Sequence, residues 1–309
     1  MLLSWITRYW FGLATMLLLA LMSYQVYQLT PFLALQDTNG LIVILIVILL
    51  MPLNWLMEVL KLFFYSQSVY KIKQCIQIIC QGQLASLFFP AGWGQWIGRV
   101  SSASNEDKIS LAKINLLSSL MQNSMNMGLG FLIAYSFVEH YLVSSELKQY
   151  YFPALVYFIF FILGSFLLIL GLSNKRVIDR IKSVFPKINF HRSQLDLRDY
   201  GLTFFLSFLR YTIYMVQFSL LVDLFTDKPL VVSIQAVACI FCIQSFIILP
   251  SVVVGAIRGG IAAYIFSYLN IPVTISISIS WLLYLINVFI PAFIAVLFYL
   301  KYRTWIVNS

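Results

Sequence analysis

Six long apolar segments constrain this chain more than any other feature of its sequence. They run over residues 11–29, 41–65, 111–138, 153–172, 200–226 and 276–300. Each is about long enough to cross the ~30 Å hydrocarbon core of a bilayer as a helix. No water reaches that core to satisfy backbone groups, so a spanning segment is a helix or a strand of a closed barrel. Continuous apolar runs exclude barrel strands, which alternate over about 10 residues.

Composition supports the same class of protein. Hydrophobic residues make up 61% of the 309 residues and charged residues 10%, with a mean hydropathy of +0.90. A soluble domain is about 45–50% apolar and about 25% charged. We therefore expect an all-α integral membrane protein, with residues 1–309 as a single transmembrane domain. The first run is expected to be retained as a helix, because no small-x-small cleavage site follows it before Thr30.

One short segment has a conflicting pattern. Residues 274–280 read TISISIS, and alternation with period two is typical of a strand. A lone strand could not complete its backbone hydrogen bonds in lipid. We therefore expect this segment to begin the last helix.

The distribution of Lys and Arg predicts the orientation. Residues 174–198 contain seven of them, and the segment 66–113 and the C-terminal tail are also basic, whereas 30–40, 139–150 and 223–228 are mainly acidic. Basic loops stay in the cytoplasm. The chain should therefore be a multi-pass protein of the cell membrane with both termini cytoplasmic. The net charge of +9 then reflects orientation and anionic lipid headgroups, and no nucleic-acid partner is expected.

Two further apolar stretches, near residues 75–98 and 229–270, are interrupted by Pro and Gly. The chain is expected to be cytoplasmic at both Lys73 and Lys108, so the first stretch must enter the membrane and return. By the same reasoning, the second stretch is expected to enter the membrane from the outer face and to return to that face as a hairpin. About six full spans plus two re-entrant helical hairpins give an inverted-topology pseudo-repeat, with halves 1–150 and 151–309. Transporters of this design bind substrate near the midplane, between broken helices.

The residues at the first interruption resemble a known family. Pro90, Gly92, Gly94, Gln95 and Arg99 are similar to the P-G-x-x-G-E-x-x-R element of the lysylphosphatidylglycerol synthase transmembrane region, also called the flippase-like family. Glutamine stands here where that element usually has glutamate.

The second interruption carries a similar resemblance. Pro250, Gly255, Arg258 and Gly259 are similar to the family's P-x-x-x-G-G-x-G-x-R-E-G element, again with glycine in place of the usual glutamate. The resemblance implies a module that moves an aminoacylated phospholipid or a related anionic lipid across the bilayer. Well-known members continue into a soluble aminoacyl-transferase domain. The last predicted helix ends close to Ser309, so synthesis of a lysyl-lipid by this chain alone is not expected.

The residue chemistry agrees with an anionic ligand. Glycines at hairpin tips let backbone N–H groups approach an anion, and arginine binds phosphate oxygens with two parallel hydrogen bonds. The alternative is that Arg99 extends to the interface and the glycines serve helix packing. Arg210 within a span needs a partner or a polar cavity, and Glu58 with Lys61 forms either a salt bridge or a polar lining. The candidate substrate-binding residues are Pro90, Gly92, Gly94, Gln95, Arg99, Arg210, Pro250, Gly255, Arg258, Gly259, Glu58 and Lys61.

These observations favour a protein that binds and translocates an anionic phospholipid or a polyprenyl phosphate. The alternatives are a membrane subunit or enzyme acting on polyprenyl-phosphate-linked glycolipids, and a scaffold for a separate synthase or glycosyltransferase. We expect no catalytic residues, metal site or cofactor, since His140 and His191 are isolated and the acidic residues are scattered among basic ones. A homo-oligomer is compatible with the sequence.

Overall fold

The computed structural model describes residues 24, 38–66, 70–88, 93–102, 108–142, 159, 164, 197–226, 228–246 and 251–301. These residues form helices and short connections, with no strand among them. The all-α prediction is thus confirmed for this part of the chain. The elements are α2 (Thr38–Tyr65), α3 (Ile72–Phe88), α4 (Trp93–Ser101), α5 (Lys108–Phe137), η1 (Val138–Leu142), α8 (Leu197–Phe225), α9 (Leu230–Ser245), α10 (Ser251–Ser267), α11 (Val273–Tyr284), η2 (Leu285–Phe289) and α12 (Ile290–Lys301).

Three helical segments are long and apolar enough to cross a membrane: Asn39–Tyr65, Asp199–Phe225 and Val273–Val296. They match three of the six expected spans and indicate a membrane protein. Apart from the single residues 24, 159 and 164, the expected spans 11–29 and 153–172 lie outside the described residues. Helix α5 covers the expected span 111–138 but is more polar, and it is not one of these three.

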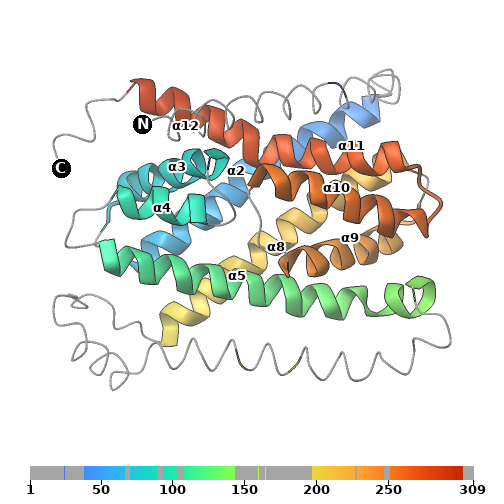
Figure 1. The fold of residues 1–309 in the computed structure, drawn as a ribbon, viewed down its shortest axis with the longest axis horizontal. Coiled ribbons are helices and arrows are strands. Elements are labelled where there is room, and N and C mark those ends of the chain that lie inside the picture. The colour runs from blue at the N-terminus through green and yellow to red at the C-terminus, as the bar shows by residue number, and fades with distance from the viewer. Residues whose placement is uncertain are drawn as a thin grey trace, which may run out of the picture.

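The helices pack around a central crossing (Figure 1). Helices α2 and α8 pack against each other in the middle of the molecule, with α5 on one side and α11 and α12 on the other. The short helices α3 and α4 lie side by side toward one end of the long axis, and α9 and α10 lie toward the other. Helix α5 packs along α9, and α12 packs against α3.

Glycine allows α3 and α4 to pack with their backbones almost in contact. A Cβ atom on Gly98 would lie 2.4 Å from the carbonyl oxygen of Gln81, and one on Gly94 would lie 2.6 Å from Cα of Ser86. No side chain fits at these distances. The four-residue spacing of the two glycines is the small-xxx-small pattern that brings membrane helices close together.

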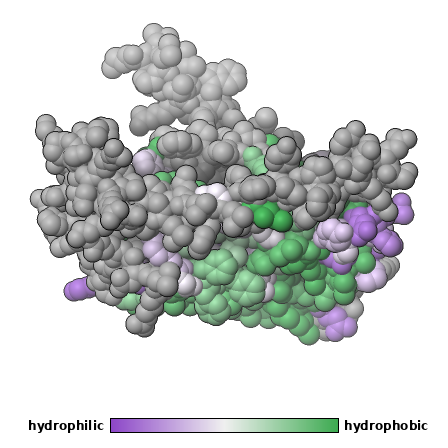
Figure 2. Space-filling view, turned by 90° about the horizontal axis from the view of Figure 1, so that it is seen from below, coloured by the Kyte–Doolittle hydropathy of each residue, from purple (hydrophilic) through white to green (hydrophobic). Residues whose placement is uncertain are grey.

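Apolar side chains cover much of the outer surface of the described part. Helix α2 alone exposes several of them, including Leu45, Leu49 and Leu53. Figure 2 shows apolar side chains over the middle of the visible surface and hydrophilic ones toward the two ends of the long axis. Such a band favours contact with lipid, because soluble proteins rarely expose large apolar patches.

The TISISIS segment is helical, as predicted. Helix α11 starts at Val273, and the hydroxyls of Ser276 and Ser280 donate to the carbonyl oxygens of Pro272 and Ser276. These two hydroxyls are therefore satisfied by carbonyl oxygens of the same segment, which lets buried polar groups lie in an apolar environment. The π-helical turn η2 follows directly, and such turns are frequent at functional sites.

Two apolar cores flank the centre of the molecule. The larger is built from α2, α5, α8 to α11 and η2, and includes Met51 and Met215. The smaller is built from α2, α3, α5 and the start of α8, and includes Leu62 and Tyr200. Along both α2 and α8, a segment with buried polar side chains, among them Asn54, Glu58 and Ser207, separates residues of one core from residues of the other; this segment is called the polar stretch. The candidate site lies in this polar stretch.

Candidate functional site

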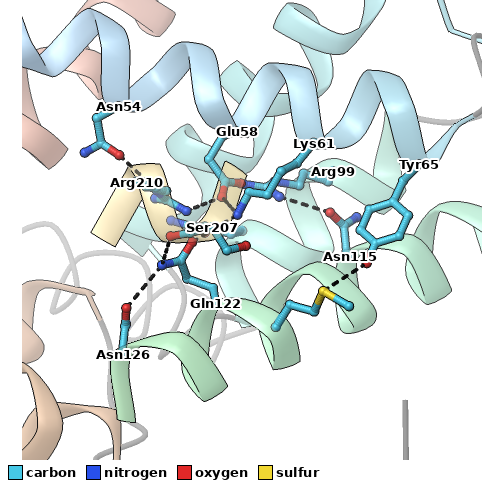
Figure 3. Close-up of polar contacts among 12 residues, drawn as sticks. Asn54, Glu58, Lys61, Tyr65, Arg99, Asn115, Gln122, Asn126, Ser207 and Arg210 are labelled. Atoms are coloured by element: carbon cyan, nitrogen blue, oxygen red, sulfur yellow. Dashed lines mark hydrogen bonds and ion pairs between the residues drawn. The ribbon is translucent and has the colours of Figure 1, made fainter. Parts of the chain in front are cut away.

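A single buried carboxylate, that of Glu58, binds three cationic side chains (Figure 3). One of its oxygens pairs with the Lys61 ammonium at 2.5 Å and with a guanidinium nitrogen of Arg210. The other oxygen accepts a hydrogen bond from Arg99 at 2.9 Å. We call Glu58, Lys61, Arg99 and Arg210 the Glu58 cluster.

The packing of three helices explains why these four side chains meet. Glu58 and Lys61 lie three residues apart on α2 and therefore share one face of that helix. Arg210 reaches them from the middle of α8, which packs against α2. Arg99 comes from α4, and its side chain lies against Gly82 of α3, where an added Cβ would lie 2.7 Å from Arg99 Cγ. Gly82 thus provides the space through which Arg99 reaches the carboxylate.

Neutral amides surround the charged groups. Asn54 accepts a hydrogen bond from Arg210 Nε at 2.9 Å and donates one to Asn287 of η2 at 3.1 Å. Lys61 donates to Gln122 at 3.1 Å, and Arg99 donates to Asn115 at 3.0 Å, both on α5. The amides tie the Glu58 cluster to α5 and to the last helical segment, so five elements meet around one carboxylate.

The Glu58 cluster is buried and carries excess positive charge. Glu58 is 5% exposed, Lys61 1% and Arg99 7%, whereas the side chain of Arg210 is 20% exposed. One carboxylate against one ammonium and two guanidiniums leaves a formal charge of +2 in their ionised forms. Leaving a buried charge without compensation is strongly destabilising. Two cations here lack a matching anion among the described residues.

Two buried donors at the same place lack an acceptor. Arg99 Nε and Asn115 Nδ2 have no hydrogen-bond partner among the described residues, although the two side chains are bonded to each other through other atoms. Buried polar atoms are nearly always hydrogen bonded. Both atoms are N–H donors, so the group that would satisfy them is an acceptor. The orientation of Arg99 toward Glu58 also excludes the alternative that its side chain extends to the interface.

Arg258 of α10 lies outside the Glu58 cluster. Its Nε donates to Gln244 of α9 at 2.7 Å, and its guanidinium carbon lies 5.7 Å from the ring centre of Phe241. Within the described part of the chain no carboxylate pairs with it. The ring of Phe241 packs edge-on against that of Tyr214, which in turn lies 5.8 Å from Arg210. Two aromatic rings thus connect Arg258 to the Glu58 cluster.

The remaining predicted residues lie outside the Glu58 cluster or outside the described residues. Gly94 serves the contact between α3 and α4, and Gln95 donates to Gln83 at 3.3 Å. Gly255 faces the rings of Trp281 and Tyr284, and Gly259 faces Ile277. Pro90, Gly92 and Pro250 are not among the described residues.

Sequence reasoning missed the amides and one glycine. Four amide side chains line the Glu58 cluster or hydrogen bond to a residue that does: Asn54, Asn115, Gln122 and Asn287. Gly82 leaves the space that the Arg99 side chain occupies. The available signal was the position of amide side chains inside apolar segments, where polar residues are costly and usually face a partner.

No protein-family model, curated protein or solved structure matches the chain. The resemblance to the flippase-like family therefore rests on the short motifs alone and stays a prediction.

Proposed function

We propose that this chain is an integral membrane protein that binds an anionic lipid at the Glu58 cluster and moves its headgroup across the bilayer. This proposal rests mainly on the three cations around one buried carboxylate, which have a net charge of +2 that no other carboxylate balances among the described residues. Ionisable residues within spans are rare and usually mark a substrate or ion pathway. In this proposal the headgroup phosphate binds beside the Glu58 cluster and balances its excess positive charge.

The helix packing supports a membrane arrangement with two re-entrant hairpins. Helices α3 with α4 and α9 with α10 are the two re-entrant hairpins in this proposal, and the six full spans surround them. Three features support it: the pairs lie toward opposite ends of the long axis, α10 also contacts α3, and each pair is interrupted where a proline stands in the sequence. The reciprocal packing of α5 on α9 and α12 on α3 is what an inverted repeat would produce.

The hydrogen-bonding groups suit a phosphate. Arg99 offers a free Nε–H and Asn115 a free amide N–H, and both are buried beside the excess charge. Hydrogen bonds from a guanidinium to phosphate oxygens are charge-assisted and stronger than neutral ones. Arg258 hydrogen bonds to the neutral amide of Gln244 and has no carboxylate partner among the described residues, so in this proposal it provides a second place for the headgroup, nearer the other hairpin.

The replacement of Asn115 by aspartate separates binding from folding. In Asn115→Asp the new carboxylate should pair with Arg99 and preserve the fold, while it removes an N–H donor and repels the phosphate. We expect the translocation of a fluorescent phosphatidylglycerol in reconstituted vesicles to fall by about ten- to hundredfold, the equivalent of one or two charge-assisted contacts. Asn270→Asp, the same change at an exposed turn, should leave the rate unchanged.

Two controls complete this experiment. Thermal unfolding of both variants should match the parent, and a fluorescent phosphatidylcholine should move more slowly than phosphatidylglycerol in the parent. Parental translocation of the anionic lipid by folded Asn115→Asp would contradict the proposed function. So would equal movement of both lipids.

A further inference from the structure

The charge of the Glu58 cluster points to a specific class of ligand. Lys61, Arg99 and Arg210 contribute three positive charges and Glu58 one negative charge, and among the described residues no other carboxylate contacts any of the three cations. The guanidiniums cannot lose their protons in a protein. A bound ligand that restores neutrality must therefore carry two negative charges.

The unused hydrogen-bond donors of the Glu58 cluster and its amides also favour a phosphate with several free oxygens. Arg99 Nε and Asn115 Nδ2 are buried and have no acceptor in the part of the chain that the structure describes, and they belong to side chains from two different helices, α4 and α5. A terminal phosphate has three non-bridging oxygens, so it can accept from several directions at once. A phosphodiester has two such oxygens and only one charge.

We propose that the Glu58 cluster binds a phosphate that carries two negative charges, which is a phosphomonoester or diphosphate headgroup, in preference to a phosphodiester. This inference rests on the proposed function, because it assumes that the ligand is a lipid. Above a pKa near 6 a phosphomonoester has a charge close to −2, which balances the +2 of the Glu58 cluster. A phosphodiester would leave one buried cation without a counter-charge.

Lys61 provides the charge that distinguishes the two ligand classes. It is 1% exposed and donates to both Glu58 and Gln122. The replacement Lys61→Gln removes one positive charge but keeps a side chain that can hydrogen bond to Gln122. The cluster then has a charge of +1, which matches a phosphodiester.

The experiment measures binding of short-chain lipids to the purified full chain in detergent by calorimetry at pH 7. The probes are dihexanoyl phosphatidate, dihexanoyl phosphatidylglycerol and inorganic phosphate. For the parent we expect the Kd for phosphatidate to be at least about tenfold lower than that for phosphatidylglycerol, the effect of about one charge-assisted contact. In Lys61→Gln the two Kd values should become about equal.

Lys71→Gln is the matched control. Lys71 is exposed, so this variant has the same change in net charge without altering the Glu58 cluster. It should keep the parent's ratio of Kd values. Equal loss of selectivity in both variants would mean that general attraction to a basic protein creates the preference, and would overturn the inference.

The remaining outcomes separate the inference from the proposed function. Equal binding of phosphatidate and phosphatidylglycerol to the parent overturns the preference for two charges and leaves anionic lipid binding intact. Inorganic phosphate that binds as tightly as phosphatidate supports the preference but contradicts a lipid ligand. If no probe binds to the folded parent, both the inference and the proposed function fail.

Discussion

The replacement Glu58→Gln is expected to lower the free energy of unfolding by about 3–5 kcal/mol, the cost of removing one partner from a buried ion pair. Three cations would then lie together without a carboxylate, and two of them, Arg99 and Arg210, cannot become neutral by losing a proton. The amides of Asn54 and Asn115 would remain, but neutral acceptors do not cancel a buried charge. We expect this to be the most destabilising polar substitution in the described part of the chain.

Unfolding in mixed micelles with an increasing fraction of sodium dodecyl sulfate measures this effect. Glu139→Gln is the matched control because Glu139 is exposed on η1, and surface substitutions usually change stability by less than about 0.5 kcal/mol. If Glu58→Gln unfolds within that margin of the parent, the carboxylate does not hold the three cations together. The geometry of the candidate site would then have to be rejected.

The replacement Gly98→Ala is expected to lower the free energy of unfolding by about 3 kcal/mol, the upper end of the usual cost of overpacking. The new methyl group would meet the carbonyl oxygen of Gln81 at 2.4 Å, together with Ala85 Cβ at 2.7 Å and Gly82 Cα at 2.8 Å. Two of these atoms belong to backbone and cannot rotate away. Helices α3 and α4 must separate, and Arg99, one residue further along α4, would be displaced from Glu58.

The control is the same substitution at Gly260 in the interior of α10. An added Cβ there meets nothing within 4 Å, so Gly260→Ala should raise the stability by about 0.5–1 kcal/mol through helix propensity. The two alanine variants should therefore change the unfolding free energy in opposite directions. A parental or higher stability for Gly98→Ala would show that α3 and α4 do not pack through this glycine.

The long helices could be predicted because bilayer thickness sets their length. The segments 41–65, 200–226 and 276–300 coincide with the three apolar helices, and the hydrogen-bond requirement in lipid was enough to identify TISISIS as helix. Proline and glycine also indicated both interruptions, between α3 and α4 and between α9 and α10. These inferences use local composition and the absence of water from the hydrocarbon core of the bilayer.

The convergence on Glu58 could not be predicted from the sequence. The i,i+3 spacing of Glu58 and Lys61 suggested a salt bridge, but Arg99 and Arg210 lie 41 and 152 positions away from Glu58. Which distant cations share a carboxylate depends on how α2, α4 and α8 pack, and no periodicity in the chain encodes that. No local pattern indicates that both arginines bind the same side chain.

A glycine in the sequence indicates that some group approaches the backbone closely, but it does not indicate whether that group is a ligand or a neighbouring helix. Gly94 was a candidate for ligand binding because glycine lets a ligand approach the backbone, yet in the structure the approaching group is the backbone of α3 at Ser86 and Ala85. The same absence of a Cβ atom suits both uses. Only the neighbouring helix distinguishes them.

Solid-state NMR can test directly whether a lipid phosphate lies at the Glu58 cluster. Protein with 15N-labelled arginine would be reconstituted with phosphatidate, and the dipolar coupling between 31P and the guanidinium nitrogens would be measured. A phosphate hydrogen bonded to Arg99 Nε places phosphorus within about 4 Å of nitrogen, so we predict strong dephasing in the parent and its loss in folded Asn115→Asp. Absence of dephasing in the parent, or equal dephasing in Asn115→Asp, would contradict a lipid phosphate site at the Glu58 cluster.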